Sequence, residues 1–276
     1  GGFNHELNPL YRKHDPQKRH VIHAWADFDN LDTHHYPTYL TGVARFNNGY
    51  KVFMPTEFMH GMYDQGHGAG LEDFWKRYSS HPLFAGGFMW DFSDNAVKRT
   101  DKVGILDSDG SNGSDGILGP YRQKEGSYYS VREVWAPIQI EPFFVTPSFN
   151  GNFIVRNDYL FSNLESCRMA FRVLNAPSPL SKDRRQQVIA SGEIALPAID
   201  PREAGKAIME MPANFFEGDI LEITAWDQHN EEICTWSWPI RYAAAYTQQQ
   251  LDQTSQEGKA TVVKEGDVVR LSAGNV

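Results

Sequence analysis

The sequence predicts an α/β domain followed by an antiparallel β-sandwich. Two short apolar runs, 52–54 and 84–90, flank a segment whose apolar residues recur at helical spacing, which is the order of a strand, a helix and a strand in a parallel sheet. From residue 138 onward apolar residues instead alternate with polar ones between turn signals such as Asn150-Gly151, as in a β-sandwich. The 276 residues are enough for one or two domains of this kind.

The first part of the chain is predicted to contain a helix and three strands. Apolar residues at helical spacing over 3–11 predict a helix, which should end at Asp15 because the residue before a proline avoids the α region. A short strand is expected over 21–25, and another should end at 34–36. The apolar run at 52–54 predicts a buried strand that stops at Pro55.

The next elements complete this predicted domain. The helix of the strand, helix and strand unit should lie over 71–78, and the strand over 84–90 should end at Trp90 and Asp91. Residues 95–119 are rich in Asp, Gly, Ser and Asn and are predicted to form a long loop, a kind of segment that is often functional or mobile. A helix over 128–135 follows, and Pro137 marks the expected domain boundary.

The remaining residues are predicted to form the sandwich and a tail. Period-two alternation in 167–173 and 221–226 indicates strands with one buried face, and the sandwich should end near Tyr242. Residues 243–260 are polar and show no apolar stripe, which predicts a linker. The last residues, 261–276, are expected to be the first strands of a further domain.

Composition excludes several classes of function. A formal charge of −9 argues against a nucleic-acid backbone as partner, and no apolar run approaches the roughly 20 residues that cross a bilayer. The aromatic content of 13% suits a carbohydrate cleft, although cores also use aromatic residues. The first residues lack the order of charge, apolar stretch and cleavage site of a signal peptide. The compartment stays open between periplasm and cytoplasm.

The cysteines and histidines do not predict a metal site. Two cysteines, Cys167 and Cys234, are too few for a disulfide framework or a zinc cluster. Four of the histidines could be considered together as ligands, but their spacing matches no compact zinc motif: His34, His35, His60 and His67. We therefore predict no metal site within the chain.

Polar and aromatic side chains follow the predicted parallel strands at the points where the strands end. Glu57 comes directly after the strand at 52–54, with His60 three residues later, and Trp90 and Asp91 end the next strand. Because the carboxyl ends of parallel strands line active sites, we expect these side chains to face one cleft. Asp91 is expected to order Trp90 and the strand end rather than to contact a ligand.

Four segments resemble one family of enzymes. TEFMHG, GLEDFW, HPLFAGGFMWDFSD and DGILGPYR are similar to the later half of the catalytic barrel of glycoside hydrolase family 2, especially its β-galactosidase branch. The resemblance covers residues 1 to about 138 and continues more weakly to about 242. It implies that 1–137 is the C-terminal half of a (β/α)8 TIM barrel and 138–242 an immunoglobulin-like β-sandwich. Residues 243–276 would then be a linker and the truncated start of a further domain.

The resemblance also implies a catalytic mechanism. Glu57 matches the family's nucleophile, which attacks the sugar to form a glycosyl-enzyme intermediate in a retaining β-glycosidase. Tyr36 resembles the family tyrosine that hydrogen-bonds this nucleophile and helps to set its ionisation. The family's acid/base glutamate would lie just upstream of Gly1. We therefore expect the isolated chain to be inactive and the rest of the barrel to come from the same gene or another chain.

Three further residues match the family's sugar-binding positions. The resemblance assigns His60 to a sugar hydroxyl, Trp90 to stacking beneath the sugar, and Asp115 to contact with sugar or a monovalent cation. No cofactor is certain, and a monovalent or divalent cation in the full-length protein stays open. Each residue also has a plainer role: a histidine satisfied by loop carbonyls, a core tryptophan, and an aspartate in an Asp-Gly turn. For Glu57 and Tyr36 the plainer roles are a strand-end cap and a core tyrosine.

The predicted substrate is a terminal β-galactoside. Glucuronidases of this family carry an Asn-x-Lys motif that binds the sugar carboxylate, and DGILGPYR stands in that region here. β-Mannosides and β-glucuronides remain alternatives. A different class of function, a non-catalytic carbohydrate-binding or scaffold protein, also remains, because the acid/base residue is not found in the chain. Whether the protein forms a homo-oligomer stays open.

Overall fold

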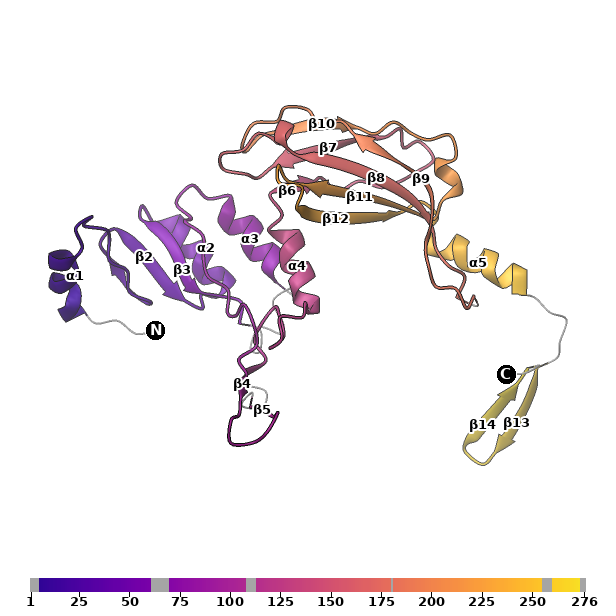
Figure 1. The fold of residues 1–276 in the computed structure, drawn as a ribbon, viewed down its shortest axis with the longest axis horizontal. Coiled ribbons are helices and arrows are strands. Elements are labelled where there is room, and N and C mark those ends of the chain that lie inside the picture. The colour runs from indigo at the N-terminus through magenta and orange to yellow at the C-terminus, as the bar shows by residue number, and fades with distance from the viewer. Residues whose placement is uncertain (1–4, 61–69, 108–112, 180, 255–259, 274–276) are drawn as a thin grey trace. The chain divides into compact units, whose positions relative to one another are not determined.

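The computed structural model describes residues 5–60, 70–107, 113–179, 181–254 and 260–273 (Figure 1). The chain divides into two compact units, Gly1–Ala136 and Pro137–Val276. The first unit contains helices, one parallel strand pair and two short antiparallel pairs, and the second consists mainly of antiparallel strands. At this level the predicted combination of an α/β part and an all-β part is confirmed.

The first unit is built around a short sheet with the order β1-β2-β3. Strand β2 pairs in parallel with β3, and helix α2 connects the two, which is a βαβ arrangement (Figure 1). Its described elements, in chain order, are η1 (His5–Leu7), α1 (Asn8–His14), β1 (Asp27–Phe28), β2 (Leu31–His35), α2 (Tyr39–Asn48), β3 (Val52–Glu57), α3 (Leu71–Ser79), β4 (Val97–Lys98), β5 (Leu106–Asp107) and α4 (Gly126–Val134).

Two further segments extend this parallel arrangement beyond β3. Phe84 and Met89 form isolated parallel bridges with Phe53 and Phe58, and Ser93 forms one with Leu118. The strand expected over 84–90 is therefore reduced to bridges at its two ends. The residues between the bridges include Gly86, whose φ is +98°, and this left-handed backbone interrupts a regular ladder.

The helices cover the sheet through aromatic side chains. One cluster joins Phe46 of α2, Phe53 of β3 and Tyr78 of α3, and a second joins Phe58 and Met59 to Leu71 of α3 and Val131 of α4. Leu71 and Tyr78 have no exposed surface. Burial raises the pKa of the Tyr78 hydroxyl well above its usual value of 10. The helices expected over 71–78 and 128–135 are confirmed, and α1 ends before Asp15 as predicted.

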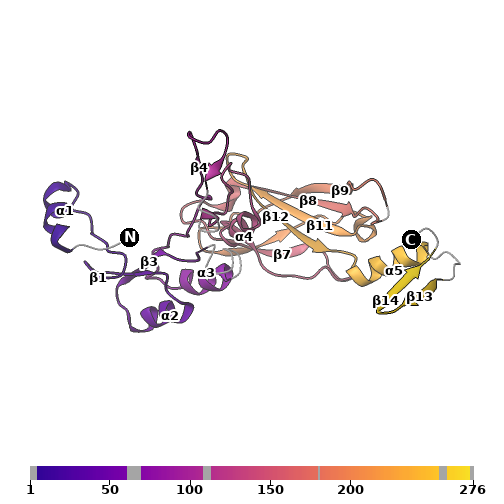
Figure 2. The same cartoon turned by 90° about the horizontal axis from the view of Figure 1, so that it is seen from below.

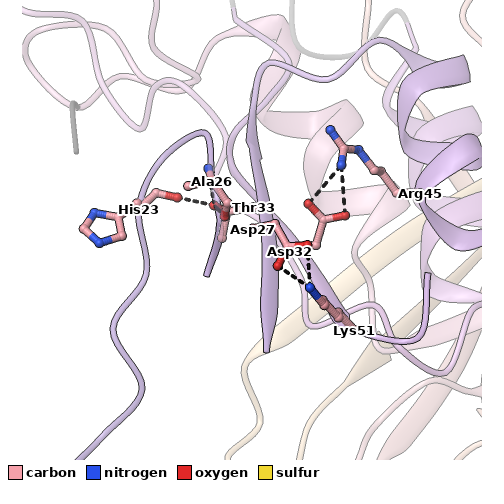
Figure 3. Close-up of polar contacts among 7 residues, drawn as sticks. All are labelled: His23, Ala26, Asp27, Asp32, Thr33, Arg45 and Lys51. Atoms are coloured by element: carbon pink, nitrogen blue, oxygen red, sulfur yellow. Dashed lines mark hydrogen bonds and ion pairs between the residues drawn. The ribbon is translucent and has the colours of Figure 1, made fainter. Parts of the chain in front are cut away.

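The strand predicted over 21–25 is wrong. These residues have no strand pairing, and Ala24 and Trp25 form a turn. The Thr33 hydroxyl of β2 has two hydrogen-bond acceptors in this segment, the carbonyl oxygens of His23 and Ala26 (Figure 3). A side chain therefore holds the segment in place of a backbone ladder.

The sequence predicts that strand β3 stops at Pro55, and that prediction is wrong. The strand continues to Glu57, and the pairing with β2 shifts register between His34 and His35. Thr56 is the additional residue on β3, so the strand contains a β-bulge there. Bulges are among the few places where a sheet accommodates proline, which cannot donate a backbone hydrogen bond.

The second unit contains two antiparallel sheets, with the orders β10-β7-β6 and β12-β11-β8-β9. The ring of Phe143 stacks on Phe153 of β7 and on Trp238 of β12, so it joins one sheet to the other. Figure 2 shows β7 of the first sheet and β8, β9, β11 and β12 of the second. The described elements of the second unit are β6 (Ile138–Ile140), β7 (Asn152–Asn157), η3 (Leu164–Ser166), β8 (Arg168–Asn175), β9 (Gln187–Ile194), β10 (Ala204–Ile208), η4 (Phe215–Glu217), β11 (Ile220–Trp226) and β12 (Glu232–Pro239), then α5 (Ala243–Thr254), β13 (Thr261–Glu265) and β14 (Val268–Ser272).

The first part of the predicted linker over 243–260 forms helix α5. Alanine and glutamine have high helix propensity, and two hydrogen bonds fix the helix to the loop after β8. Tyr246 donates its hydroxyl to the Pro177 carbonyl at 3.0 Å, and Ser178 donates to Gln250 Oε1 at 2.7 Å. The strands β13 and β14 form a hairpin where the sequence predicted strands.

Candidate functional site

Glu57 lies at the carboxyl end of β3, directly after the bulge. Its Cα pairs with that of His35 at the end of β2, whereas Pro55 pairs with His34. A bulge changes the direction in which the following side chains point. The consequence here is that the side chains of Glu57 and His35 meet at the end of the parallel pair.

Two side chains contact the same oxygen of the Glu57 carboxylate. The Tyr36 hydroxyl donates to Glu57 Oε2 at 2.9 Å, and His35 Nε2 lies 3.3 Å from that atom. The backbone N–H of Tyr36 also donates to the Glu57 carbonyl oxygen at 2.8 Å. The Glu57 side chain keeps 25% of its surface exposed. The carboxylate is thus fixed in orientation and still reachable from solvent.

His60, Trp90 and Asp115 form a second group beside the first. Asp115 Oδ2 accepts a hydrogen bond from Trp90 Nε1 at 3.2 Å and lies 3.8 Å from His60 Nε2. The rings of His60 and Trp90 stack with their centroids 6.4 Å apart, and the His60 ring lies 5.7 Å from that of Tyr36. The structure therefore joins all five residues that the sequence singled out into one connected set.

Backbone hydrogen bonds between neighbouring segments hold the second group in place. Phe58 N–H donates to the Phe88 carbonyl at 2.9 Å, which aligns the chain after β3 with the segment that leads to Trp90. Asp91 N–H donates to the Asp115 carbonyl at 3.0 Å. The Asp91 side chain accepts from the backbone N–H of Phe92, which agrees with the structural role expected for Asp91.

One oxygen of Asp115 accepts no hydrogen bond from the described residues. The side chain of Asp115 is buried, and no described residue donates a hydrogen bond to its Oδ1. A buried acceptor without a donor is costly, and such exceptions call for an explanation such as a bound group. The geometry places an acceptor for an O–H or N–H group next to the rings of His60 and Trp90.

Sequence reasoning did not assign His35 to this site. Its ring is 14% exposed, and its Nδ1 lies 3.3 Å from Thr56 Oγ1. The available signal was its position beside Tyr36 at a strand end, but the contact with Glu57 depends on the register of β2 and β3. His34, one residue earlier, has a pKa that burial and the nearby Arg45 charge lower below the usual 6.5.

Other carboxylates of the sheet are engaged away from Glu57. Figure 3 shows Lys51 paired with Asp27 of β1, at 2.6 Å from Oδ1, and Arg45 of α2 paired with Asp32 of β2 at 3.4 Å. Asp29 pairs with Arg12 at 2.8 Å. Ion pairs of this kind hold the strands and helices together and leave these carboxylates occupied.

The described part of the chain contains no group of three or more His, Cys, Asp or Glu residues arranged to hold a metal ion. His67, one of the four histidines considered for a metal, lies outside the described residues. No helix among the described residues has the length and apolar character to span a membrane. Cys167 and Cys234 are not joined in a disulfide.

Proteins named β-galactosidase are among those that this chain is similar to. No family model matches the chain. It is 26% identical over 213 residues to a β-galactosidase of Bifidobacterium adolescentis, covering 72% of this chain and 18% of that protein. It is also 26% identical over 131 residues to a β-galactosidase of Priestia megaterium, covering 43% of this chain and 12% of that protein. A third relative, a β-galactosidase large subunit of Lactobacillus acidophilus, is 30% identical over 106 residues, which are 35% of this chain and 16% of that protein.

Two solved structures with detectable similarity are distant. An exo-chitosanase of Amycolatopsis orientalis matches 74% of this chain and 20% of its own, with 12% identity and a TM-score of 0.25. A β-glucosidase of Thermotoga neapolitana matches 38% of this chain and 16% of its own, with 12% identity and a TM-score of 0.24. The sequence similarity is to part of larger proteins named β-galactosidases, because the chain spans less than one fifth of each.

Proposed function

We propose that this chain carries the nucleophile side of the active site of a retaining β-glycosidase that hydrolyses terminal β-galactosides. The observation that carries the proposal is the Glu57 carboxylate, held on one oxygen by Tyr36 and His35 and partly open to solvent. The names of the relatives support the reaction class and the sugar. The resemblance of TEFMHG and HPLFAGGFMWDFSD to glycoside hydrolase family 2 supports the role of Glu57.

The reaction would proceed in two steps. In the first, Glu57 Oε1 attacks the anomeric carbon, the bond to the leaving oxygen breaks, and that oxygen takes a proton from a general acid. In the second, water attacks the same carbon, its proton passes to the same acid/base group, and the carboxylate departs. We place that group outside this chain, as the family resemblance implies. The ion pairs of Asp27 and Asp29 leave neither of them suited to this role.

The sugar would bind over the second group of residues. Trp90 offers a ring for stacking against the apolar face of the sugar, and His60 and Asp115 offer polar atoms to its hydroxyls. The unused Asp115 Oδ1 is a suitable acceptor for one of them. The presence of DGILGPYR where glucuronidases carry their carboxylate-binding motif favours a neutral sugar.

The proposal includes the architecture that the resemblance implies. The order of β2, β3 and the bridged segments, with α2 and α3 between them, supports the later half of a (β/α)8 barrel. The two antiparallel sheets support an immunoglobulin-like sandwich over 138–242. The rest of the barrel would come from the same gene or from another chain, because the relatives are more than five times as long as their match to this chain.

The test is covalent labelling with 2-deoxy-2-fluoro-β-galactosyl fluoride, followed by intact mass and peptide mapping. The good leaving group needs little acid assistance, so labelling reports the nucleophile alone. We expect one sugar on Glu57 in the natural gene product that contains this chain, and none in Glu57→Gln. Glu72→Gln, on the exposed first turn of α3, is the matched control and should label like the wild type.

Different outcomes separate the alternatives. Labelling by the mannosyl or glucuronyl reagent in place of the galactosyl one would replace the sugar and keep the mechanism. Binding of galactosides without labelling by any reagent would favour a carbohydrate-binding protein. Turnover of a nitrophenyl β-galactoside by the purified 276-residue chain, lost in Glu57→Gln, would show that the acid lies within the chain.

A further inference from the structure

We propose that His35 is a positioning residue for Glu57, and that it acts mainly in the second step, when the sugar leaves the carboxylate. This inference rests on the proposed function. Its structural basis is the 3.3 Å contact between His35 Nε2 and Glu57 Oε2, the same oxygen that accepts the Tyr36 hydroxyl at 2.9 Å. No described residue donates a hydrogen bond to Glu57 Oε1, so Oε1 is the oxygen left to bond the sugar.

The hydrogen bonds around His35 assign a proton to Nε2. Thr56 Oγ1 lies 3.3 Å from His35 Nδ1 and within reach of the carbonyl oxygens of Ala24, at 3.0 Å, and His34, at 3.3 Å. If Thr56 donates its proton to a carbonyl, His35 Nδ1 must carry the ring proton in order to donate to Thr56 Oγ1. In a neutral ring Nε2 would then be unprotonated, and its lone pair would face the Glu57 carboxylate. That arrangement is repulsive. The neutral ring protonated at Nε2 and the imidazolium both donate to Glu57.

Aromatic rings fix the direction of this donor. The His35 ring makes edge-to-face contacts with the rings of Trp25 and Tyr36, with ring centroids 4.8 Å and 4.7 Å apart. The His35 side chain is only 14% exposed. A donor that is shielded from water and held in one orientation interacts more strongly with a developing charge than one in bulk solvent.

The charge on Oε2 changes in opposite directions in the two steps. When Oε1 bonds to the anomeric carbon, Oε2 becomes the carbonyl oxygen of an ester and loses negative charge. When water attacks, the C–O bond to Oε1 breaks, its electron pair returns to the carboxylate, and Oε2 regains charge. A donor on Oε2 therefore stabilises the departing carboxylate in the second step and weakens the nucleophile in the first.

The test compares three variants of the natural gene product that contains this chain. His35→Leu removes the donor and keeps a side chain of similar volume, and His35→Gln restores an N–H near the position of Nε2. His34→Gln is the matched control, because it changes the neighbouring histidine, which has no contact with the Glu57 carboxylate among the described interactions. The readout is the rate at which the 2-fluorogalactosyl enzyme reactivates, with kcat and KM for dinitrophenyl β-galactoside.

We expect His35→Leu to slow reactivation about tenfold or more, the size of one hydrogen bond to a charged group. Both kcat and KM should fall together, because the intermediate accumulates. His35→Gln should recover most of the rate, and His34→Gln should match the wild type. If His35→Leu is too unstable to purify, Thr56→Val provides the second test. It removes the partner of Nδ1 and should slow reactivation in the same direction.

Two results would overturn the inference alone: unchanged reactivation in His35→Leu and Thr56→Val, or equal loss in His35→Leu and His35→Gln, which would assign His35 to packing. Failure of the wild-type protein to label at Glu57 would overturn the proposed function and this inference together.

Discussion

Tyr36 and Glu57 are joined twice although 21 residues separate them in the sequence. The phenol of Tyr36 donates to Glu57 Oε2 at 2.9 Å, and its backbone N–H donates to the Glu57 carbonyl at 2.8 Å. Tyr36 has a φ of 53°, in the left-handed region where a bulky residue is uncommon. The pairing of β2 with β3 brings both residues to the same strand end, so the sheet sets the geometry of the carboxylate.

Removing the phenol should slow catalysis. Tyr36→Phe keeps the ring and deletes the donor to Glu57 Oε2, and we expect kcat for a nitrophenyl β-galactoside to fall about 10- to 100-fold, since a hydrogen bond to a charged group contributes about 1.5–3 kcal/mol. Initial rates of the natural gene product measure this. Tyr39→Phe is the control, because Tyr39 packs edge-on against Phe74 and lies at the start of α2. Equal rates in Tyr36→Phe and wild type would remove the role assigned to Tyr36.

The Asp115 carboxylate should contribute to stability as the acceptor of Trp90. Asp115→Leu removes the acceptor at 3.2 Å from Trp90 Nε1, and the free energy of unfolding should fall by about 1–3 kcal/mol. Asp115→Asn keeps an oxygen in that place and should lose less. Urea unfolding followed by tryptophan fluorescence gives both values. A loss in Asp115→Asn as large as that in Asp115→Leu would show that the charge matters rather than the hydrogen bond.

The contact between α2 and α3 should not tolerate a side chain at Gly42. A Cβ there would lie 1.8 Å from the hydroxyl and 2.2 Å from a ring carbon of Tyr78, whose side chain is fully buried. Gly42→Ala should lower the free energy of unfolding by about 1–3 kcal/mol, measured by urea unfolding, because Tyr78 must move within a packed core.

Gly126 is the matched position for that substitution. It begins α4, and a Cβ there meets nothing within 4 Å. Gly126→Ala should be neutral or stabilising by about 0.5–1 kcal/mol. If both alanine variants lose stability equally, close packing at Gly42 is not the cause.

The ion pair between Asp15 and Arg19, which follows α1, should depend on pH. Hydrogen bonds from the Arg19 side chain and backbone lower the pKa of Asp15 from 3.8 to about 2. Because the folded pKa is the lower one, the contribution of this pair is present above about pH 3.8 and is lost as pH falls through about 2. An NMR titration of the Asp15 carboxyl measures its pKa. Arg19→Gln should raise the pKa of Asp15, while Arg12→Gln, which removes the partner of Asp29, should leave it unchanged.

Local patterns predicted many of the elements. Apolar residues at helical spacing located α3, and period-two alternation located β8 and β11, because one face of each of these elements is buried. The structure differs from the predicted elements where another interaction competed with the apolar pattern. The Thr33 side chain replaced a backbone ladder at 21–25, and helix propensity with two hydrogen bonds ordered α5 in a polar segment.

For the candidate site, the sequence by itself determined which residues to consider. Position at the ends of predicted strands selected Glu57, His60 and Trp90, and the family resemblance added Tyr36 and Asp115. Only the tertiary structure decided that His35, rather than His34, contacts Glu57. The reason is physical. Side chains alternate along a strand, so the partner of Glu57 depends on the register of the parallel pair, and the bulge at Thr56 changes that register by one residue.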